Sequence, residues 1–175
     1  MNICKKTYIP RRLLRIAGIG MVVCLVTNLT KAQEAPPRPI VIYINPAQGL
    51  NFGTFTHGTS GGSVIIYANG TRSSTGDVVQ LSSGLPFSPA IFEVEANLGT
   101  VVHIINGPNV TLTGSNGGFL TMQLGSSNTG SPFITNVLPP GRTEVRIGGT
   151  LLVGNSLSNP GGAYSGSFMI TFIQE

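Results

Sequence analysis

The sequence predicts an all-β domain, an antiparallel β-sandwich, that follows an N-terminal signal peptide. The 175 residues include 24 Gly and 12 Pro, and only 9% are charged, whereas long helices and coiled coils are rich in Ala, Glu, Lys, Leu and Arg. Short runs of β-branched and aromatic residues alternate with turn residues, a pattern typical of sandwiches and barrels. No long window sustains a helical period. At this length we expect one domain.

Residues 1–32 have the organisation of a secretory signal peptide. Basic residues are concentrated before position 16, and the apolar stretch 16–26 that follows has 11 residues, whereas a membrane-spanning helix needs about 20. Thr30 and Ala32 are small residues placed as a signal peptidase requires. We therefore expect cleavage after Ala32 and export to the periplasm, the outer cell surface or the medium. Cleavage one residue later, a lipoprotein signal at Cys24 and an uncleaved anchor are the alternatives.

Removal of this segment changes the charge and the cysteine content. The whole chain has a formal charge of +4, but residues 33–175 keep four Arg, six acidic residues and no Lys, a net charge of −2. Nucleic-acid binding needs a clustered basic face, so no nucleic-acid partner is expected. Cys4 and Cys24 both leave with the signal, which predicts a domain without disulfides or thiolate metal sites, stabilised by its core. No transmembrane segment is expected in the mature chain.

Residues 33–39 contain three prolines and are predicted to be an extended leader, so that the single domain spans residues 40–175. The first strand, 40–44, is a run of β-branched and aromatic residues and is expected to be buried on both faces. Further strands are predicted at 50–55, 63–68, 77–81, 90–96, 100–105, 110–113, 119–124, 133–137, 143–147, 150–153 and 163–173. Four Gly-Gly pairs precede such runs and are interpreted as turns: Gly61-Gly62, Gly117-Gly118, Gly148-Gly149 and Gly161-Gly162.

The last predicted strand, 163–173, alternates most regularly. Its larger side chains, Tyr164, Phe168, Ile170 and Phe172, fall on one face, and mostly smaller or polar groups fall on the other. A strand of this kind ties the end of the domain into a sheet, and its removal is expected to unfold the domain.

Four segments resemble a bacterial secreted family catalogued as domain of unknown function 4402. They are Leu-Asn-Phe-Gly at 50–53, Ser-Thr-Gly-Asp-Val at 74–78, Val-Arg-Ile-Gly-Gly-Thr-Leu at 145–151 and Gly-Ala-Tyr-Ser-Gly-Ser-Phe-Met-Ile-Thr at 162–171, whose Gly-x-Tyr-x-Gly-x-Phe is the most specific part. The resemblance covers about residues 39–172. It implies export, an immunoglobulin-like or pilin-like β-sandwich similar to envelope subunits, and no assigned activity or catalytic residue.

The likeness to pilins leaves two arrangements open. In pilins an incomplete sandwich is filled by a neighbour's N-terminal strand. Here Ile40, Ile42 and Ile44 would form the donated face, and Tyr164, Phe168, Ile170 and Phe172 the face that closes the fold. Gln174 replaces the penultimate aromatic residue of pilins, and the leader is short and rich in proline. In the second arrangement, residues 40–44 are the domain's own first strand and the fold is complete.

One cluster of residues has the composition of a catalytic or metal site. Glu93 and Glu95 share a strand face, and His103 on the next strand would lie opposite them. Such a set can ligate a metal ion or transfer protons, but a solvated face paired with Arg142 or Arg146 is the preferred interpretation. His57 is expected in a loop. Asp77 is the single Asp in the chain, which argues against a calcium loop.

We therefore expect no catalytic residue, cofactor or metal. The predicted function is that of a non-catalytic, exported surface or envelope protein, a structural or adhesive and fimbria-like subunit. Its partners would be further copies of itself or other envelope β-sandwich subunits. The alternative is a secreted module that binds a carbohydrate or another partner. With no Trp, and with Tyr43, Tyr67 and Tyr164 as the only tyrosines after residue 32, an aromatic platform for a sugar would be poor.

Overall fold

The structure, a computed structural model, describes residues 38–82 and 84–175. The predicted signal peptide, and all of the leader except Arg38 and Pro39, lie outside these residues. The described part contains thirteen strands and one short 3-10 helix, η1 (Pro46–Gln48), and no α-helix. The strands are β1 (Val41–Ile44), β2 (Asn51–Phe52), β3 (Phe55–Ile66), β4 (Arg72–Gln80), β5 (Phe87–Ser88), β6 (Ala90–Glu95), β7 (Val101–Asn106), β8 (Val110–Gly114), β9 (Phe119–Ser127), β10 (Phe133–Ile134), β11 (Thr143–Val153), β12 (Tyr164–Ser165) and β13 (Ile170–Gln174).

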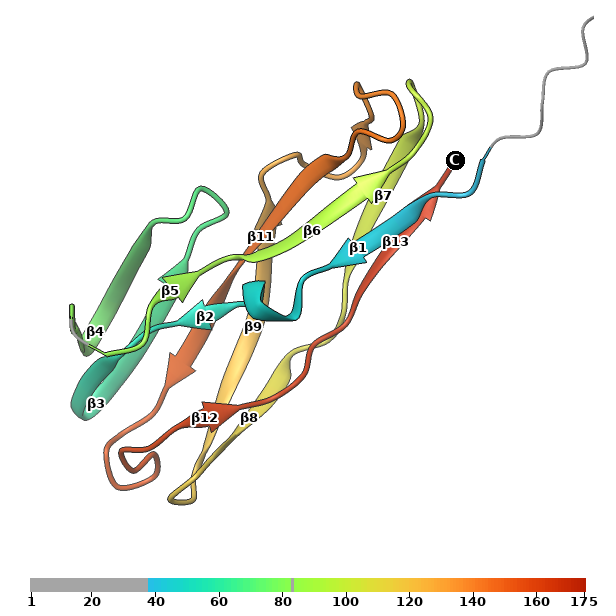
Figure 1. Cartoon of the computed structure of the whole chain (residues 1–175). Helices are drawn as coiled ribbons and strands as arrows, with labels where there is room; N and C mark the ends of the chain where they lie inside the picture. The colour runs from blue at the N-terminus through green and yellow to red at the C-terminus, as the bar shows by residue number, and fades with distance from the viewer. Residues whose placement is uncertain (1–37, 83) are drawn as a thin grey trace, which may run out of the picture. The chain divides into compact units, whose positions relative to one another are not determined.

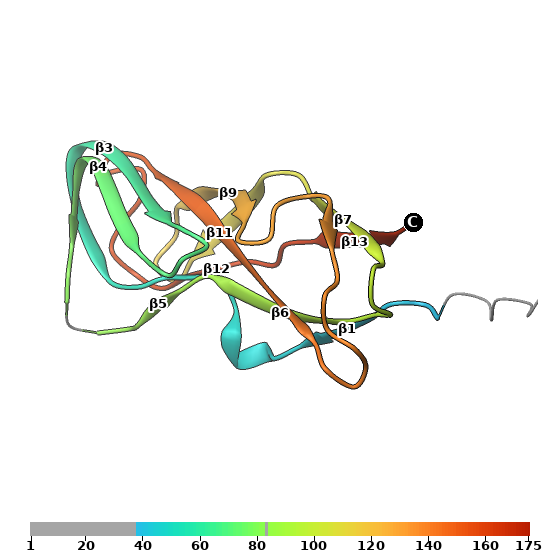
Figure 2. The same ribbon diagram turned by 90° about the horizontal axis from the view of Figure 1, so that it is seen from above.

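The strands form one large sheet, one small sheet and a ribbon, all with antiparallel pairing. The large sheet has the order β1-β6-β11-β9-β8-β12, with β3 and β4 branching from β11. The small sheet has the order β10-β7-β13, and β2 pairs with β5. The strands are labelled in Figure 1, and Figure 2 shows β1 and β6 on one side of the domain and β7 and β13 on the other. The predicted antiparallel β-sandwich is therefore confirmed.

The long strand β11 connects the two ends of the domain. Residues 143–147 pair with β6, and residues 149–153 pair with β3 along the same edge, while β9 occupies the opposite edge. Val145 and Ile147 of this strand are fully buried. The first half of β11 pairs with β6 and the second half pairs with β3. Each half therefore contributes to a different hydrophobic core.

The two cores differ in how they are covered. The closed core lies between β6 and β11 of the large sheet and β7 and β10 of the small sheet. Its buried members are Ala90, Phe92, Val94, Val102, Phe133, Val145 and Ile147. The open core lies on β3, β8, β9 and the second half of β11, where only short segments such as β2 and β12 face it. Its buried members are Phe52, Val64, Ile66, Val78, Leu112, Leu120, Met122, Leu151 and Val153.

The run 163–173 is two strands and not the single strand that was predicted. β12 pairs with β8 in the large sheet, and β13 pairs with β7 in the small sheet. Gly166 lies where the chain crosses between them, and a Cβ there would stand 2.7 Å from the Leu112 side chain. The predicted alternation persists through the crossing, because Phe168, Ile170 and Phe172 are half-buried and their neighbours are exposed.

The first strand is also less buried than the sequence suggests. β1 lies at the edge of the large sheet and pairs with β6 of the same chain. Val41, Tyr43 and Ile44 are all exposed, Ile44 to 65%. The prediction of burial on both faces was wrong because an apolar composition does not reveal that a strand lies at an edge.

Two of the four glycine pairs are inside strands and not in turns. Gly61-Gly62 lies in β3, where the pairing with β4 shifts register between His57 and Gly62. Gly148-Gly149 lies in β11, beside a register shift between Ile147 and Gly149. Gly61 has a φ of +70°, and a Cβ there would stand 2.5 Å from the Val153 carbonyl oxygen, so the close approach of β11 requires glycine. The irregular strand β3 begins at Phe55, so His57 lies in a strand and not in the predicted loop.

The side chain of Gln174 joins the first and last strands. Its Oε1 accepts a hydrogen bond from the Ile40 N–H at 3.0 Å, and its Nε2 donates one to the Arg38 carbonyl at 3.1 Å. A parallel neighbouring strand makes the same pair of contacts, to the carbonyl of one residue and the N–H two residues later. We call this pair of hydrogen bonds the Gln174 clasp. It joins the edge of the large sheet beside β1 to the edge of the small sheet at β13.

Candidate functional site

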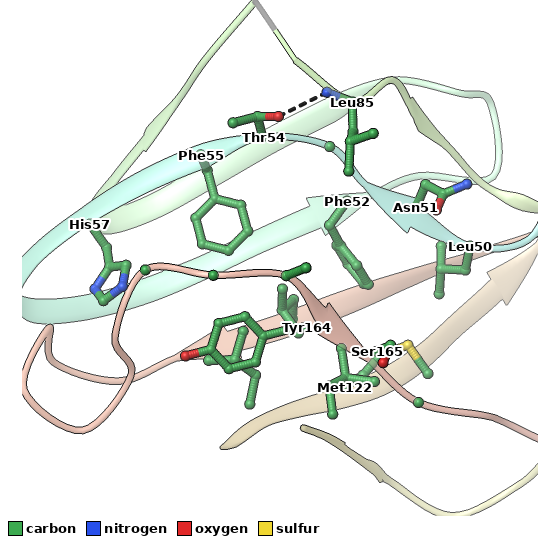
Figure 3. Close-up of a pocket in the computed structure, with 18 of the residues that line it drawn as sticks. Leu50, Asn51, Phe52, Thr54, Phe55, His57, Leu85, Met122, Tyr164 and Ser165 are labelled. Atoms are coloured by element: carbon green, nitrogen blue, oxygen red, sulfur yellow. Dashed lines mark hydrogen bonds between the residues drawn. The ribbon is translucent and has the colours of Figure 1, made fainter. Parts of the chain in front are cut away.

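An apolar pocket of about 370 Å³ opens over the open core. Its floor consists of buried side chains from four strands: Phe52, Leu112, Leu120, Met122 and Leu151. Figure 3 shows the rings of Phe52, Phe55 and Tyr164 directed toward the same space. Among the described residues that line this pocket there is no Asp, Glu, Lys or Arg. The site is therefore suited to an uncharged, apolar group.

Arg72 holds one wall of the pocket in place. Its guanidinium Nη1 donates to the carbonyls of Phe52 at 3.1 Å and Thr54 at 3.2 Å, and its Nη2 donates to Leu81 at 3.0 Å. The carbonyls of Phe52 and Thr54 belong to the corner between β2 and β3, where Gly53 has a φ of +71°, and Leu81 directly follows β4. The guanidinium also lies 4.5 Å from the centre of the Phe87 ring. Arg72 thus fixes the corner from which Phe52 and Phe55 extend, a role that the sequence analysis missed.

The opposite wall is held by two polar side chains of the segment 154–166. Asn159 is buried, and its Nδ2 donates to the Phe119 carbonyl at 2.6 Å while its Oδ1 accepts from the Gly154 N–H at 2.7 Å. The Tyr164 hydroxyl donates to the Pro160 carbonyl at 2.7 Å. The Tyr164 ring is therefore fixed at the mouth of the pocket (Figure 3).

The seven residues predicted to form the donated face and the face that closes the fold are distributed over both cores. Ile40, Ile42, Ile170 and Phe172 pack against the closed core, Tyr164 packs against the open core, and Phe168 packs against both. Phe172 lies across the sandwich from Phe92, with ring centres 5.5 Å apart. Ile44 is exposed and packs against neither core. Of the seven residues, Tyr164 and Phe168 line the pocket.

The predicted juxtaposition of Glu93, Glu95 and His103 is wrong. The two acids lie on β6 of the large sheet, and His103 lies on β7 of the small sheet, so the strands that carry them are not paired. His103 Nε2 is 3.0 Å from Glu175 Oε1, although the angle is outside that of a hydrogen bond. Among the described residues, no group of three or more His, Cys, Asp and Glu side chains is placed to hold a metal ion.

The acids instead pair with Arg142, as the preferred interpretation required. Arg142 Nη1 is 2.7 Å from Glu93 Oε2, and its Nε is 3.8 Å from Glu95 Oε2. The hydrogen bond that Arg142 donates to the Glu93 carboxylate raises the pKa of Arg142 above its ordinary value. The guanidinium covers the Tyr43 ring at 3.5 Å. This charged face of the sheet is internally paired, and Tyr43 offers no open platform to a sugar.

Two further side chains of interest lie at or near the pocket. His57 lines one end of it, with its ring 6.5 Å from that of Phe55. Asp77 accepts a hydrogen bond from the Ser60 N–H at 3.3 Å. In this position Asp77 stabilises the irregular part of β3.

Fold and pocket together define an antiparallel β-sandwich with an apolar cleft at the edge of its large sheet. Residues 42–173 match the family described as Domain of unknown function (DUF4402), and the chain belongs to that family. This confirms the predicted resemblance. Comparison with curated proteins and with solved structures found no match. In the part of the chain that the structure describes, no helix is long and apolar enough to cross a membrane.

Proposed function

We propose that this protein is an exported, non-catalytic β-sandwich subunit of the bacterial envelope or cell surface, with a structural or adhesive and fimbria-like role. The observation that carries the proposal is the uncharged, apolar pocket of about 370 Å³ at the edge of the large sheet. Large apolar recesses on soluble domains mark sites where a ligand or another chain binds.

The placement of the ionisable side chains supports a non-catalytic role. Glu93 and Glu95 pair with Arg142 on the outer face of the large sheet, and His103 lies beside Glu175 on the small sheet. The pocket brings His57 together with apolar and neutral polar groups only. A general acid or base needs a reacting group within hydrogen-bond reach, usually with a second polar group to orient it.

Export is tested by expressing the full chain in a bacterial host and determining the N-terminus of the protein in each fraction. We expect the protein outside the cytoplasm, with an N-terminus at residue 33 or close to it. Deletion of residues 2–26 should retain the protein in the cytoplasm. Recovery of the intact chain from the cytoplasm, with residues 1–32 attached, would contradict the proposal.

Assembly is tested by electrophoresis of the exported protein without boiling. A structural subunit is expected to give an SDS-resistant ladder that heating converts to a monomer band. The second candidate, a secreted module that binds a partner without polymerising, is favoured by the pairing of β1 with β6 in its own chain, because a strand held in this way is not donated to a neighbour. A single monomer band, together with saturable binding of a partner, would select this second candidate.

A further inference from the structure

We propose that the pocket binds an extended peptide strand from a partner chain, with uncharged apolar side chains at alternate positions. The strand would add to the free edge of residues 164–168 and place its apolar side chains over the open core. This inference rests on the proposed function for its biological partner, because it names the part of that partner which the site recognises.

The main chain of residues 164–168 has an unpaired edge. Ser115 N–H donates to the Ala163 carbonyl at 2.8 Å, and Ser165 is paired with Thr113. Main-chain groups of successive residues in a strand point to opposite edges. Ala163 and Ser165 therefore face β8, and Tyr164 and Gly166 present their N–H and C=O groups to the other edge.

No strand of the described residues occupies that other edge, since β12 is the terminal strand of the large sheet. Pairing resumes farther along, where Gly107 N–H donates to the Met169 carbonyl at 2.9 Å. By the same alternation, Phe168 also presents its main chain to the free edge. A partner strand would thus find hydrogen-bonding groups at every second residue over five residues.

The side chains beside this edge match an apolar strand. Tyr164 and Phe168 lie on the pocket side of the segment, and Leu112 and Met122 form the floor between them. In an added strand every second side chain would point to this floor. A small apolar molecule would contact the same floor but would leave the main-chain groups of Tyr164 and Gly166 without a protein partner.

The charge of the site favours an uncharged occupant. Of the described lining residues, none is acidic or basic apart from His57 at one end. A charged side chain placed over the floor would lose its hydration without gaining an ion-pair partner. The peptide segment over the pocket is therefore expected to carry residues such as Ile, Val, Leu or Phe.

The test uses a synthetic peptide with the sequence of residues 38–46 as a probe, because its isoleucines alternate. Binding to the exported protein is measured by fluorescence polarisation of the labelled peptide. Two matched peptides carry backbone N-methyl groups, one at Ile40, Ile42 and Ile44 and the other at Val41 and Tyr43. Only one of these sets of N–H groups would face the free edge.

We expect one methylated peptide to bind about tenfold or more weakly than the unmodified peptide, and the other to bind nearly as well. Equal binding of the two methylated peptides would show an apolar cavity without strand addition and would overturn the proposal. Absence of measurable binding by the unmodified peptide would overturn it as well.

A pair of protein variants locates the binding site. Leu85 is exposed at the pocket rim, so Leu85→Asp is expected to weaken peptide binding about tenfold without changing the unfolding midpoint. Leu157 is also exposed but does not line the pocket, and Leu157→Asp should leave binding unchanged. Equal binding by both variants would overturn the assignment of the pocket. Failure of export or polymerisation, with peptide binding intact, would reject the proposed function alone.

Discussion

The closed and open cores both contain residues of β11, yet they differ in how completely other strands cover them. Residues 143–147 of β11 face the small sheet, whose strands β7 and β10 cover the buried side chains of the closed core. Residues 149–153 face short segments that leave the pocket exposed. The covering strand differs because β13 belongs to a three-stranded sheet, whereas β12 has two residues and one partner. One end of the domain is thus built for stability, and the other retains apolar surface that can be used for binding.

The largest expected effect comes from a matched pair of substitutions. Phe92 in the closed core and Phe52 in the open core are exposed to 7% and 8%. Phe92→Ala should lower the free energy of unfolding by about 3–5 kcal/mol. Phe52→Ala should cost only about 2–3 kcal/mol, because the space it leaves joins the pocket and is open to water. Urea unfolding of both variants measures the difference, and equal losses would contradict the distinction between the cores.

The next effect concerns the wall of the pocket. Asn159→Ala removes hydrogen bonds to Gly154 N–H and the Phe119 carbonyl in a buried position, which should cost about 2–3 kcal/mol. Ser156→Ala, at an exposed position of the same loop, is the control and should cost less than half as much. Thermal unfolding followed by circular dichroism compares the two. A similar loss in both variants would mean that the loop, and not the buried amide, supports the wall.

A smaller effect is expected from the Gln174 clasp at the closed end. Gln174→Ala removes both hydrogen bonds to residues 38 and 40 and should cost about 1–2 kcal/mol. Hydrogen exchange at the Ile40 amide should become faster, whereas Gln123→Ala, at an exposed position of β9, should change neither quantity. Unchanged exchange at Ile40 would show that the pairing of β1 with β6 protects this end without the clasp.

The smallest effect is expected on the charged outer face of the closed end. Glu93→Gln weakens the pairing with Arg142, but both side chains are well exposed and solvent screens their attraction. The unfolding midpoint should shift less than in Gln174→Ala, and the shift should shrink further at high salt. A shift as large as that of Asn159→Ala would mean that the outer face stabilises the closed end as much as the core does.

The fold class and the approximate positions of most strands along the chain could be predicted from local sequence. The points where strands divide, merge or cross between sheets could not. Runs such as 90–96 and 100–105 became β6 and β7 almost unchanged. By contrast, 163–173 is divided between two sheets, and 143–147 and 150–153 are joined in β11. Whether glycines make a turn, a bulge or a crossing depends on which distant strand approaches them, as Val153 approaches Gly61.

The candidate site was predicted only in part, for a similar reason. Tyr164 and Phe168 were singled out because the alternation placed them on an apolar face. The pocket itself depends on how short the covering segments are, which no local pattern reports. Arg72 offered a faint signal, since it is a cation in a Ser- and Thr-rich strand with no acid directly beside it in sequence. The N–H donors of such a side chain can be satisfied by main-chain carbonyls, as they are here.

The position of the Gln174 clasp also bears on how the domain would respond to tension. Arg38 and Gln174 are joined by a hydrogen bond, and Figure 1 shows the C-terminus close to β1, so pulling these two residues apart would break the clasp and then peel β1 from β6 one bond at a time. Tension applied between residues 38 and 174 would therefore be resisted first by the clasp and by the short pairing of β1 with β6, and only later by the closed core.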